Sequence, residues 1–235
     1  MIGIPCRKCG SINICKNGRT KHGDQKYHCR DCSFYGTFVT QEEKQKKKED
    51  LTEKLICERV SQRGTARPAR VSRNRLTAII KKKEIPPAAS GIVKTEERPA
   101  VEIDEIWSFA GSKQCKVWIW IAIDRNTRQI VGVAFGDRSD KTCLELRRSL
   151  PPDYRKRAVI YTDFRESYGN VLPSERLRQS GKESGGTAHI ERFNNTLRQR
   201  CPGMVRKSLS FSKNKETHEK RIRIFINNYN AGLSV

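Results

Sequence analysis

The stretch Val101-Glu102-Ile103-Asp104-Glu105-Ile106-Trp107-Ser108-Phe109 (residues 101–109) determines the fold class expected of this chain. Apolar residues alternate with polar ones along it, which is typical of a β-strand with one buried face. Farther along, the apolar runs 117–124 and 130–135 flank the polar segment 125–129 and predict a β-hairpin. The run 158–163 predicts a buried strand that carries an acid, Asp163, at its carboxyl end.

Helices are predicted on either side of this last strand. One extends from about Ser139, a suitable N-cap, to Leu150, where two prolines end it. Another covers residues 189–200. The order is therefore three strands, a helix, a strand and then helices, which is the order of a ribonuclease-H-like α/β domain. In that fold three acids meet at the sheet edge and bind two divalent ions.

Three acids of this chain are the candidates for such a site. Asp104 and Asp163 lie on predicted strands, and active sites of open α/β sheets form at the carboxyl ends of strands. Glu191 lies on the predicted helix 189–200, where Asn195 and Arg198 share its face at i+4 and i+7. Two Mg²⁺ ions roughly 3.5–4 Å apart need several carboxylate oxygens held on rigid elements. Alternatively, the segment 189–200 is an ordinary basic surface helix.

Six blocks of the sequence, in order, resemble the catalytic part of insertion sequence 1 family transposases. No single block is decisive, whereas six in the right order are specific. The resemblance covers the chain from residue 101 to the end. The blocks are residues 104–113, 124–132, 161–164, 181–184, 189–200 and 205–213.

The resemblance implies a DDE transposase in which Asp104, Asp163 and Glu191 bind Mg²⁺ or Mn²⁺. Water would first cut DNA to release a 3′-hydroxyl, and that hydroxyl would then attack target DNA by phosphodiester transesterification. The auxiliary residues that would hold a phosphate or a terminal base pair are His189, Asn195 and Arg198.

Other acids compete with Glu191 for the third metal position. Glu183 follows a basic loop, and Glu166 comes three residues after Asp163, on a turn where it would face solvent. Glu102 and Glu105 flank Asp104 and are expected on the opposite sheet face or away from the site.

The first 40 residues predict a separate zinc ribbon. The two Cys-x-x-Cys pairs lie nineteen residues apart, and each pair supplies two thiolates to a zinc tetrahedron. A substitute ligand from Cys15, His22 or His28 would require the pairs to break, and disulfides are not expected because the nine cysteines leave one over. The predicted structural zinc ligands are Cys6, Cys9, Cys29 and Cys32.

A helix-turn-helix module is predicted at 41–85, followed by a linker at 86–98 and the catalytic domain at 99–235. Apolar residues at helical spacing indicate a helix at 51–60, and two shorter segments follow at 62–69 and 72–83. The second of these begins with a serine N-cap and resembles a recognition helix. The predicted DNA-binding residues are Ser72, Arg73, Asn74, Arg75, Lys81, Lys82, Arg206 and Lys207.

Several residues depart from the family pattern. Pro68 and Gly64 weaken the helix before the turn, and Arg70 occupies the usual turn glycine. Residues 201–204, Cys-Pro-Gly-Met, interrupt the helix after Glu191, and Arg165 replaces an aromatic residue. The DNA-reading module is therefore either a working reader of the element ends or a damaged, non-specific one, and the chain is either active or a decayed copy.

Charge agrees with a nucleic-acid partner. The net charge is +22, and residues 1–98 carry 23 basic and 11 acidic side chains against 25 and 15 in the remainder. Both parts would attract a polyanion. The longest apolar run, 117–123, is too short to span a membrane.

The sequence therefore predicts a cytoplasmic, nucleoid-associated transposase that binds the terminal inverted repeats and target DNA. It would act as a homo-oligomer, because two DNA ends must be joined. One alternative is an inactive copy that acts as a DNA-binding repressor. The other is a structure-selective nuclease on the same fold, which would not need the N-terminal reader.

Overall fold

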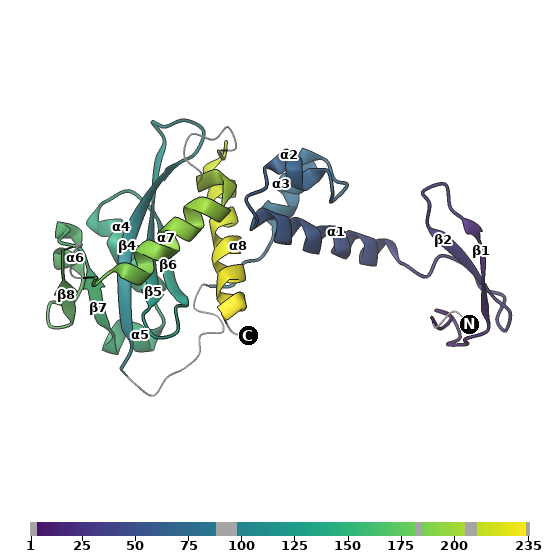
Figure 1. Cartoon of the computed structure of the whole chain (residues 1–235), viewed down its shortest axis with the longest axis horizontal. Coiled ribbons are helices and arrows are strands. Elements are labelled where there is room, and N and C mark those ends of the chain that lie inside the picture. The colour runs from purple at the N-terminus through teal and green to yellow at the C-terminus, as the bar shows by residue number, and fades with distance from the viewer. Residues whose placement is uncertain (1–3, 88–97, 182–184, 205–210, 234–235) are drawn as a thin grey trace. The chain divides into compact units, whose positions relative to one another are not determined.

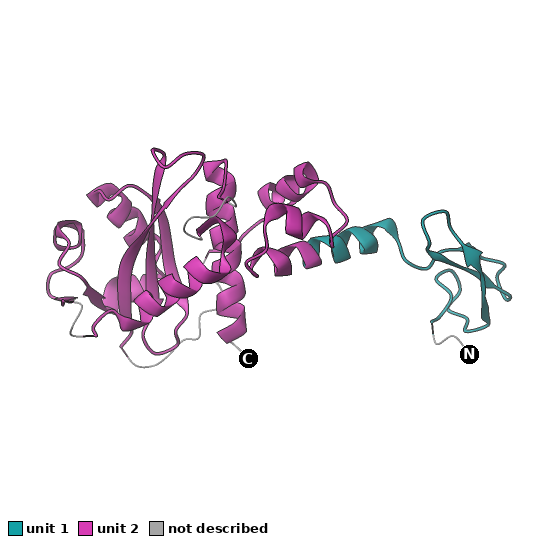
Figure 2. Cartoon of the chain, turned by 45° about the horizontal axis from the view of Figure 1, so that its top comes forward, with its two compact units in different colours: residues 1–50 teal, residues 51–235 magenta. Residues whose placement is uncertain are grey.

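The computed structural model describes residues 4–87, 98–181, 185–204 and 211–233. The chain divides into two compact units, residues 1–50 and 51–235 (Figure 2). The division falls within the helix α1 (Gln41–Ile56). The sequence predicts a boundary after residue 40 and a separate module at 41–85, whereas this division falls after residue 50 and groups the rest of that module with the large sheet domain. Within the described ranges, no helix is both long and apolar enough to cross a membrane.

The N-terminal unit is built on a small antiparallel sheet. Its strands β1 (Ile14–Arg19), β2 (Gln25–Cys29) and β3 (Tyr35–Gly36) follow one another in that order. Because the sheet is small, aromatic packing supplies much of its apolar contact, and the rings of Tyr27 and Phe38 stack with centroids 4.5 Å apart. Thr40 and Glu43 form a reciprocal capping box that starts α1.

The large unit contains a mixed five-stranded sheet in the order β6-β5-β4-β7-β8 (Figure 1). The first three strands, β4 (Ala100–Phe109), β5 (Lys116–Asp124) and β6 (Ile130–Gly136), are antiparallel. Strands β7 (Val159–Thr162) and β8 (Leu177–Gln179) then continue parallel to β4. The predicted α/β class, the hairpin and the strand ending before Asp163 are confirmed, whereas β8 was not predicted.

Helices cover both faces of this sheet. One face packs against α4 (Asp140–Ser149), α5 (Pro152–Arg157) and α6 (Glu166–Val171), and the other against α7 (Ala188–Arg200) and α8 (Lys215–Leu233). The expectation that residues 101–109 have one buried face is therefore wrong. Strand β4 is central, so Ile103 is buried on the first face and Ile106 on the second. Crossover helices on both faces are the usual consequence of parallel strands.

Two short helices of the predicted DNA-reading module belong to the core of the large unit. Helices α2 (Gln62–Ala66) and α3 (Arg73–Lys82) follow α1, and Ile56, Leu76 and Ile80 share one apolar cluster with Phe225 of α8. Helix α2 ends before Pro68, and the turn that follows contains a residue with positive φ. That residue is Arg70, with φ of 51°, a conformation that favours glycine.

The N-caps behave partly as predicted. Ser72 precedes α3, and its hydroxyl accepts a hydrogen bond of 3.1 Å from the Arg75 amide. Ser139 precedes α4 but its hydroxyl makes no cap bond to the helix. Asp137 supplies the nearby acceptor instead, taking hydrogen bonds from the Ser139 amide and the Thr142 hydroxyl.

A buried histidine joins α8 to β4. His218 contacts the Ser108 hydroxyl through Nε2 at 2.8 Å and the Ser212 hydroxyl through Nδ1 at 3.1 Å. Burial, with a further contribution from the positive charge of Arg221, lowers the pKa of His218 to about 4. The folded protein therefore holds this imidazole in the neutral form.

We expect the free energy of unfolding to fall as the pH drops from about 6.5 to about 4. In that range His218 takes up a proton in the unfolded chain but not in the folded chain. This uptake stabilises the unfolded state and lowers the free energy of unfolding by about 3 kcal/mol in all. Urea unfolding at a series of pH values measures the slope. His218→Gln, which keeps one donor and one acceptor, should flatten the slope; equal slopes in both proteins would contradict this assignment.

Candidate active site and cysteine cluster

Two of the three candidate acids come from neighbouring parallel strands: Asp104 lies within β4, and Asp163 directly follows β7. Strand β4 pairs in parallel with β7, and the last registered pair is Glu102 with Tyr161, two residues before each acid. The negative charge of Asp163 acts on Asp104, so the two carboxylates are close. Asp104 accepts hydrogen bonds of 2.8 Å from the Glu105 amide and from the Asn194 carboxamide. Parallel pairing thus brings two carboxylates from distant parts of the sequence to one edge of the sheet.

Asp104 is held in an environment that disfavours its charge. Burial first, and then the negative charges of Glu105 and Asp163, raise the pKa of Asp104 to about 6 against the hydrogen bonds it accepts. Among the described residues, no cationic side chain forms an ion pair with Asp104. A partly buried carboxylate beside other acids and without a cationic partner is typical of an active or metal-binding site.

The third acid lies on the helix that contacts Asp104. Glu191 is in the first turn of α7, one turn before Asn194, so both fall on the same side of the helix. The Glu191 carboxylate is exposed and accepts a hydrogen bond of 3.1 Å from the Thr187 hydroxyl. The ligand atoms of the three acids are not gathered into one tight cluster, whereas those of four cysteines are, within the part of the chain described.

The predicted auxiliaries have different surroundings. His189 is partly buried, and its Nδ1 donates a hydrogen bond of 2.6 Å to the Glu102 carboxylate. Asn195 is exposed, and Arg198 is partly buried on the same helix. Helix α7 ends at Arg200, as the following Cys-Pro-Gly sequence predicts, and a 3₁₀ turn (Pro202–Met204) follows it.

Asn194 is the contact that the sequence did not reveal. Helical spacing placed Asn195 beside Glu191, but i+3 and i+4 both lie on that side of a helix. The structure points Asn194 at Asp104 and leaves Asn195 in solvent. The buried position of Asn194 depends on how α7 crosses β4, which residue spacing alone does not define.

A buried glutamate fixes the start of α7. The Glu102 side chain is fully buried and accepts hydrogen bonds from the amides of His189 and Ile190 at 2.8 and 3.0 Å. It also forms an ion pair of 3.0 Å with Arg125. The expectation that Glu102 points away from the site is wrong, because side chains two apart on a strand share a face and Glu102 therefore lies on the Asp104 side.

Glu105 lies on the opposite face, as expected. One of its carboxylate oxygens forms ion pairs with Arg138, at 2.7 Å, and with Arg165. The other accepts a 2.7 Å hydrogen bond from the Tyr168 hydroxyl. Glu166, a competitor for the third metal position, is exposed at the start of α6, and Glu183 lies outside the described residues.

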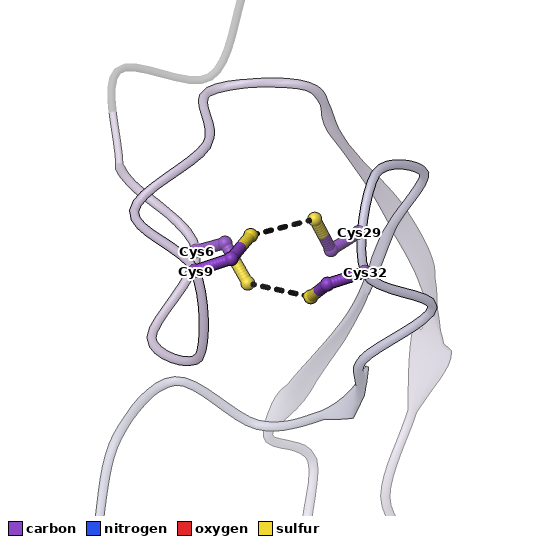
Figure 3. Close-up of side chains that lie close together, drawn as sticks. All are labelled: Cys6, Cys9, Cys29 and Cys32. Atoms are coloured by element: carbon purple, nitrogen blue, oxygen red, sulfur yellow. Dashed lines mark hydrogen bonds between the residues drawn. The ribbon is translucent and has the colours of Figure 1, made fainter.

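The four predicted cysteines come together in the N-terminal unit (Figure 3). The Sγ atoms of Cys6 and Cys32 lie 3.6 Å apart, as do those of Cys9 and Cys29. All four sulfur atoms lie within 4.8 Å of one another. The Lys8 amide donates to the Cys6 sulfur at 3.4 Å, a contact that favours a thiolate there.

The predicted DNA-binding residues of α3 are mostly exposed. Arg73, Asn74 and Lys82 lie on its surface, whereas Lys81 forms an ion pair of 3.3 Å with Glu216 of α8. The Ser72 hydroxyl is engaged as the N-cap of the helix. Arg206 and Lys207 lie outside the described residues.

We expect Glu102→Ala to lower the free energy of unfolding by about 3–5 kcal/mol, because it leaves Arg125 and the amides at the start of α7 without their buried acceptor. Glu102→Gln should cost less, since a carboxamide oxygen still accepts from the amides. Chemical denaturation measures both. Glu145→Ala, at an exposed position on α4, is the matched control, and an equal effect of Glu102→Ala and Glu145→Ala would contradict the assignment.

Comparison with known proteins supplies the family. The family model described as IS1 transposase matches residues 99–231. The insertion element iso-IS1n protein InsB of Shigella dysenteriae is 40% identical over 125 residues, which cover 53% of this chain and 92% of that protein. The insertion element IS1 protein InsB of Shigella flexneri is 38% identical over 126 residues, covering 54% and 92%.

A similar match is found in another genus. The insertion element IS1 4 protein InsB of Escherichia coli strain K12 is 37% identical over 127 residues, which cover 54% of this chain and 72% of that protein. The matched region of the family model contains the large sheet, α7 and α8. This chain belongs to the IS1 transposase family.

Proposed function

We propose that this chain is a DDE transposase that binds the terminal inverted repeats of its element and catalyses metal-dependent DNA cleavage and strand transfer. The observation that carries the proposal is that Asp104 on β4 and Asp163, directly after the parallel strand β7, are close enough for the charge of Asp163 to act on Asp104, beside a helix that bears Glu191 and is hydrogen-bonded to Asp104. The sheet order β6-β5-β4-β7-β8, with three antiparallel strands first, supports a ribonuclease-H-like domain.

The residues present fit a divalent metal. Asp104 is a partly buried oxygen ligand near a second carboxylate, and its pKa is raised by burial and then by the neighbouring negative charges, both of which a bound cation would offset. Asp104, Asp163 and Glu191 would hold Mg²⁺ or Mn²⁺. When bound, these ions supply Lewis-acid stabilisation of the attacking and leaving oxygens.

The protein's own contacts prepare this site. The Asn194 carboxamide fixes one oxygen of Asp104, and Glu102 fixes the first turn of α7, which carries Glu191. One oxygen of Glu191 accepts from the Thr187 hydroxyl, and the other would act as the ligand. His189 is oriented by Glu102 through Nδ1, which leaves Nε2 as the ring nitrogen that would face the DNA.

The cysteine cluster fits a structural zinc ion. Zn–S bonds of about 2.3 Å in a tetrahedron place sulfur atoms roughly 3.8 Å apart, close to the separations in this cluster. We propose that Cys6, Cys9, Cys29 and Cys32 hold Zn²⁺ in a zinc ribbon, and that α2 and α3 form a helix-turn-helix that reads the repeats through Arg73 and its neighbours. The DNA-bound protein would be a homo-oligomer in the bacterial nucleoid, because two ends must be joined.

A second candidate function is that of a DNA-binding repressor without catalysis. It is favoured by the five-residue length of α2, which ends before Pro68, and by the end of α7 at Arg200. Either departure from the family pattern would displace DNA-contacting side chains while the fold is kept.

The test of catalysis uses the purified chain with DNA ends taken from the flanks of its own gene. We expect Mg²⁺- or Mn²⁺-dependent nicking and strand joining, and a loss of about a hundredfold or more in Asp163→Asn, which keeps the shape but removes a ligand charge. Asp153→Asn, at an exposed position on α5, is the matched control.

Binding without nicking in the unaltered protein would exclude catalysis and leave the repressor. Cleavage that survives deletion of residues 1–90 would favour a structure-selective nuclease.

Zinc is tested separately. We expect one tightly bound Zn²⁺ per chain, lost in Cys9→Ser, together with the near-ultraviolet signal of the Tyr27 stack, because the small sheet has little core without the ion. Metal analysis and circular dichroism measure both effects. Cys15→Ser is the control, since the Cys15 thiol contacts the His28 carbonyl rather than the cluster. Full zinc content in Cys9→Ser would contradict the assigned ligands.

A further inference from the structure

A large aromatic side chain is exposed directly beside the candidate active site. Phe164 follows Asp163 and is 72% exposed, more than any other large hydrophobic residue in the described part of the chain. Single exposed apolar residues are common on protein surfaces and need no explanation. Here, however, the ring is attached to the residue that follows a candidate catalytic acid, where DNA would have to approach.

Two arginines lie close to the chain segment that carries this ring. Arg165 is the next residue, and its amide donates to the Asp163 carboxylate at 3.2 Å. Its guanidinium shares one oxygen of Glu105 with the guanidinium of Arg138, which comes from the segment between β6 and α4. Arg138 also lies over the Trp118 ring, 3.7 Å from its centroid, so packing restricts its orientation.

This group carries more positive charge than its buried acid requires. The Glu105 side chain is 1% exposed, and one guanidinium together with the Tyr168 hydroxyl would satisfy both of its oxygens. The second guanidinium is in excess and is repelled by the first. The side chains of Arg138 and Arg165 remain 41% and 23% exposed, which leaves them access to an anion.

Guanidinium groups and an exposed ring together fit one kind of ligand. Arginine presents several N–H donors in a planar arrangement that matches a phosphate group. Aromatic rings stack on unpaired bases with little regard to base identity. A nucleotide at a frayed or unpaired DNA end contains both a phosphate and a base that is free to stack.

We propose that Phe164, Arg138 and Arg165 form a nucleotide-binding subsite beside the candidate active site. Phe164 stacks on an unpaired base at a DNA end, and the two arginines bind the adjoining backbone phosphate. This inference rests on the proposed function for its DNA ligand. The same chemistry serves an element end or target DNA, and the experiment separates these two sources.

The base is tested with 2-aminopurine placed at the terminal position of an element-end duplex, once in each strand. Binding is followed without divalent ions, so that no cleavage occurs. We expect stacking to quench the fluorescence in the unaltered protein. Phe164→Leu should lose the quenching and Phe164→Tyr should keep it, because leucine matches the apolar character and lacks the ring.

The phosphate is tested through the salt dependence of binding. Each lost phosphate contact reduces the slope of log K against log salt by roughly 0.9. We expect this reduction and about a tenfold weaker nicking in Arg138→Ala, while Arg165 keeps Glu105 paired and the melting temperature stays close to that of the unaltered protein. Arg157→Ala, at an exposed position on α5, is the control and should leave slope and nicking unchanged.

Strand joining of a pre-cut end to target DNA forms the second arm. A defect of Arg138→Ala confined to this arm assigns the subsite to target DNA, whereas a defect in end binding and nicking assigns it to the element end. Unchanged quenching in Phe164→Leu together with an unchanged slope in Arg138→Ala overturns the inference. The absence of nicking by the unaltered protein counts against the proposed catalysis, and the binding measurements then still decide the subsite.

Discussion

The buried carboxylate of Glu102 is the interaction on which the geometry of the candidate site depends. It lies on the central strand and accepts from the first amides of α7, which would otherwise be unsatisfied at a buried helix start. The position of α7 over β4 determines where Glu191 and Asn194 lie. The Glu102 carboxylate at this N-terminus also complements the helix dipole. Its ion pair with Arg125 offsets the cost of removing the carboxylate from water.

The acidic residues of β4 lie on both faces of the sheet and have different contacts on each face. Glu102 and Asp104 face α7, where one holds the helix and the other is a candidate ligand. Glu105 faces α6, where it forms ion pairs with two arginines and accepts a hydrogen bond from a tyrosine. Successive side chains of a strand point to opposite faces of the sheet, so one short segment supplies acids to both faces.

Much of this arrangement is predictable from sequence, for identifiable reasons. The hairpin of β5 and β6, the strand before Asp163 and the cysteine cluster follow from patterns that are local or have fixed spacing. Strand β8 has three residues and too little pattern to be recognised. The role of Glu102 was missed although strand alternation places it on the side of Asp104. The contact of Asn194 with Asp104 could not be predicted, because it depends on how α7 crosses β4, which is a property of the tertiary structure.

Helix α3 and the helix that bears Glu191 pack into one apolar cluster. Leu76 and Ile80 of α3 lie in the same apolar cluster as Phe193 of α7 and Phe225 of α8. If α3 reads DNA from this position, its distance from the candidate active site is set by this packing. The number of base pairs between the sequence it recognises and the bond that is cut would then be constant. Insertions or deletions within an element's terminal repeat would then be tolerated less well than base substitutions.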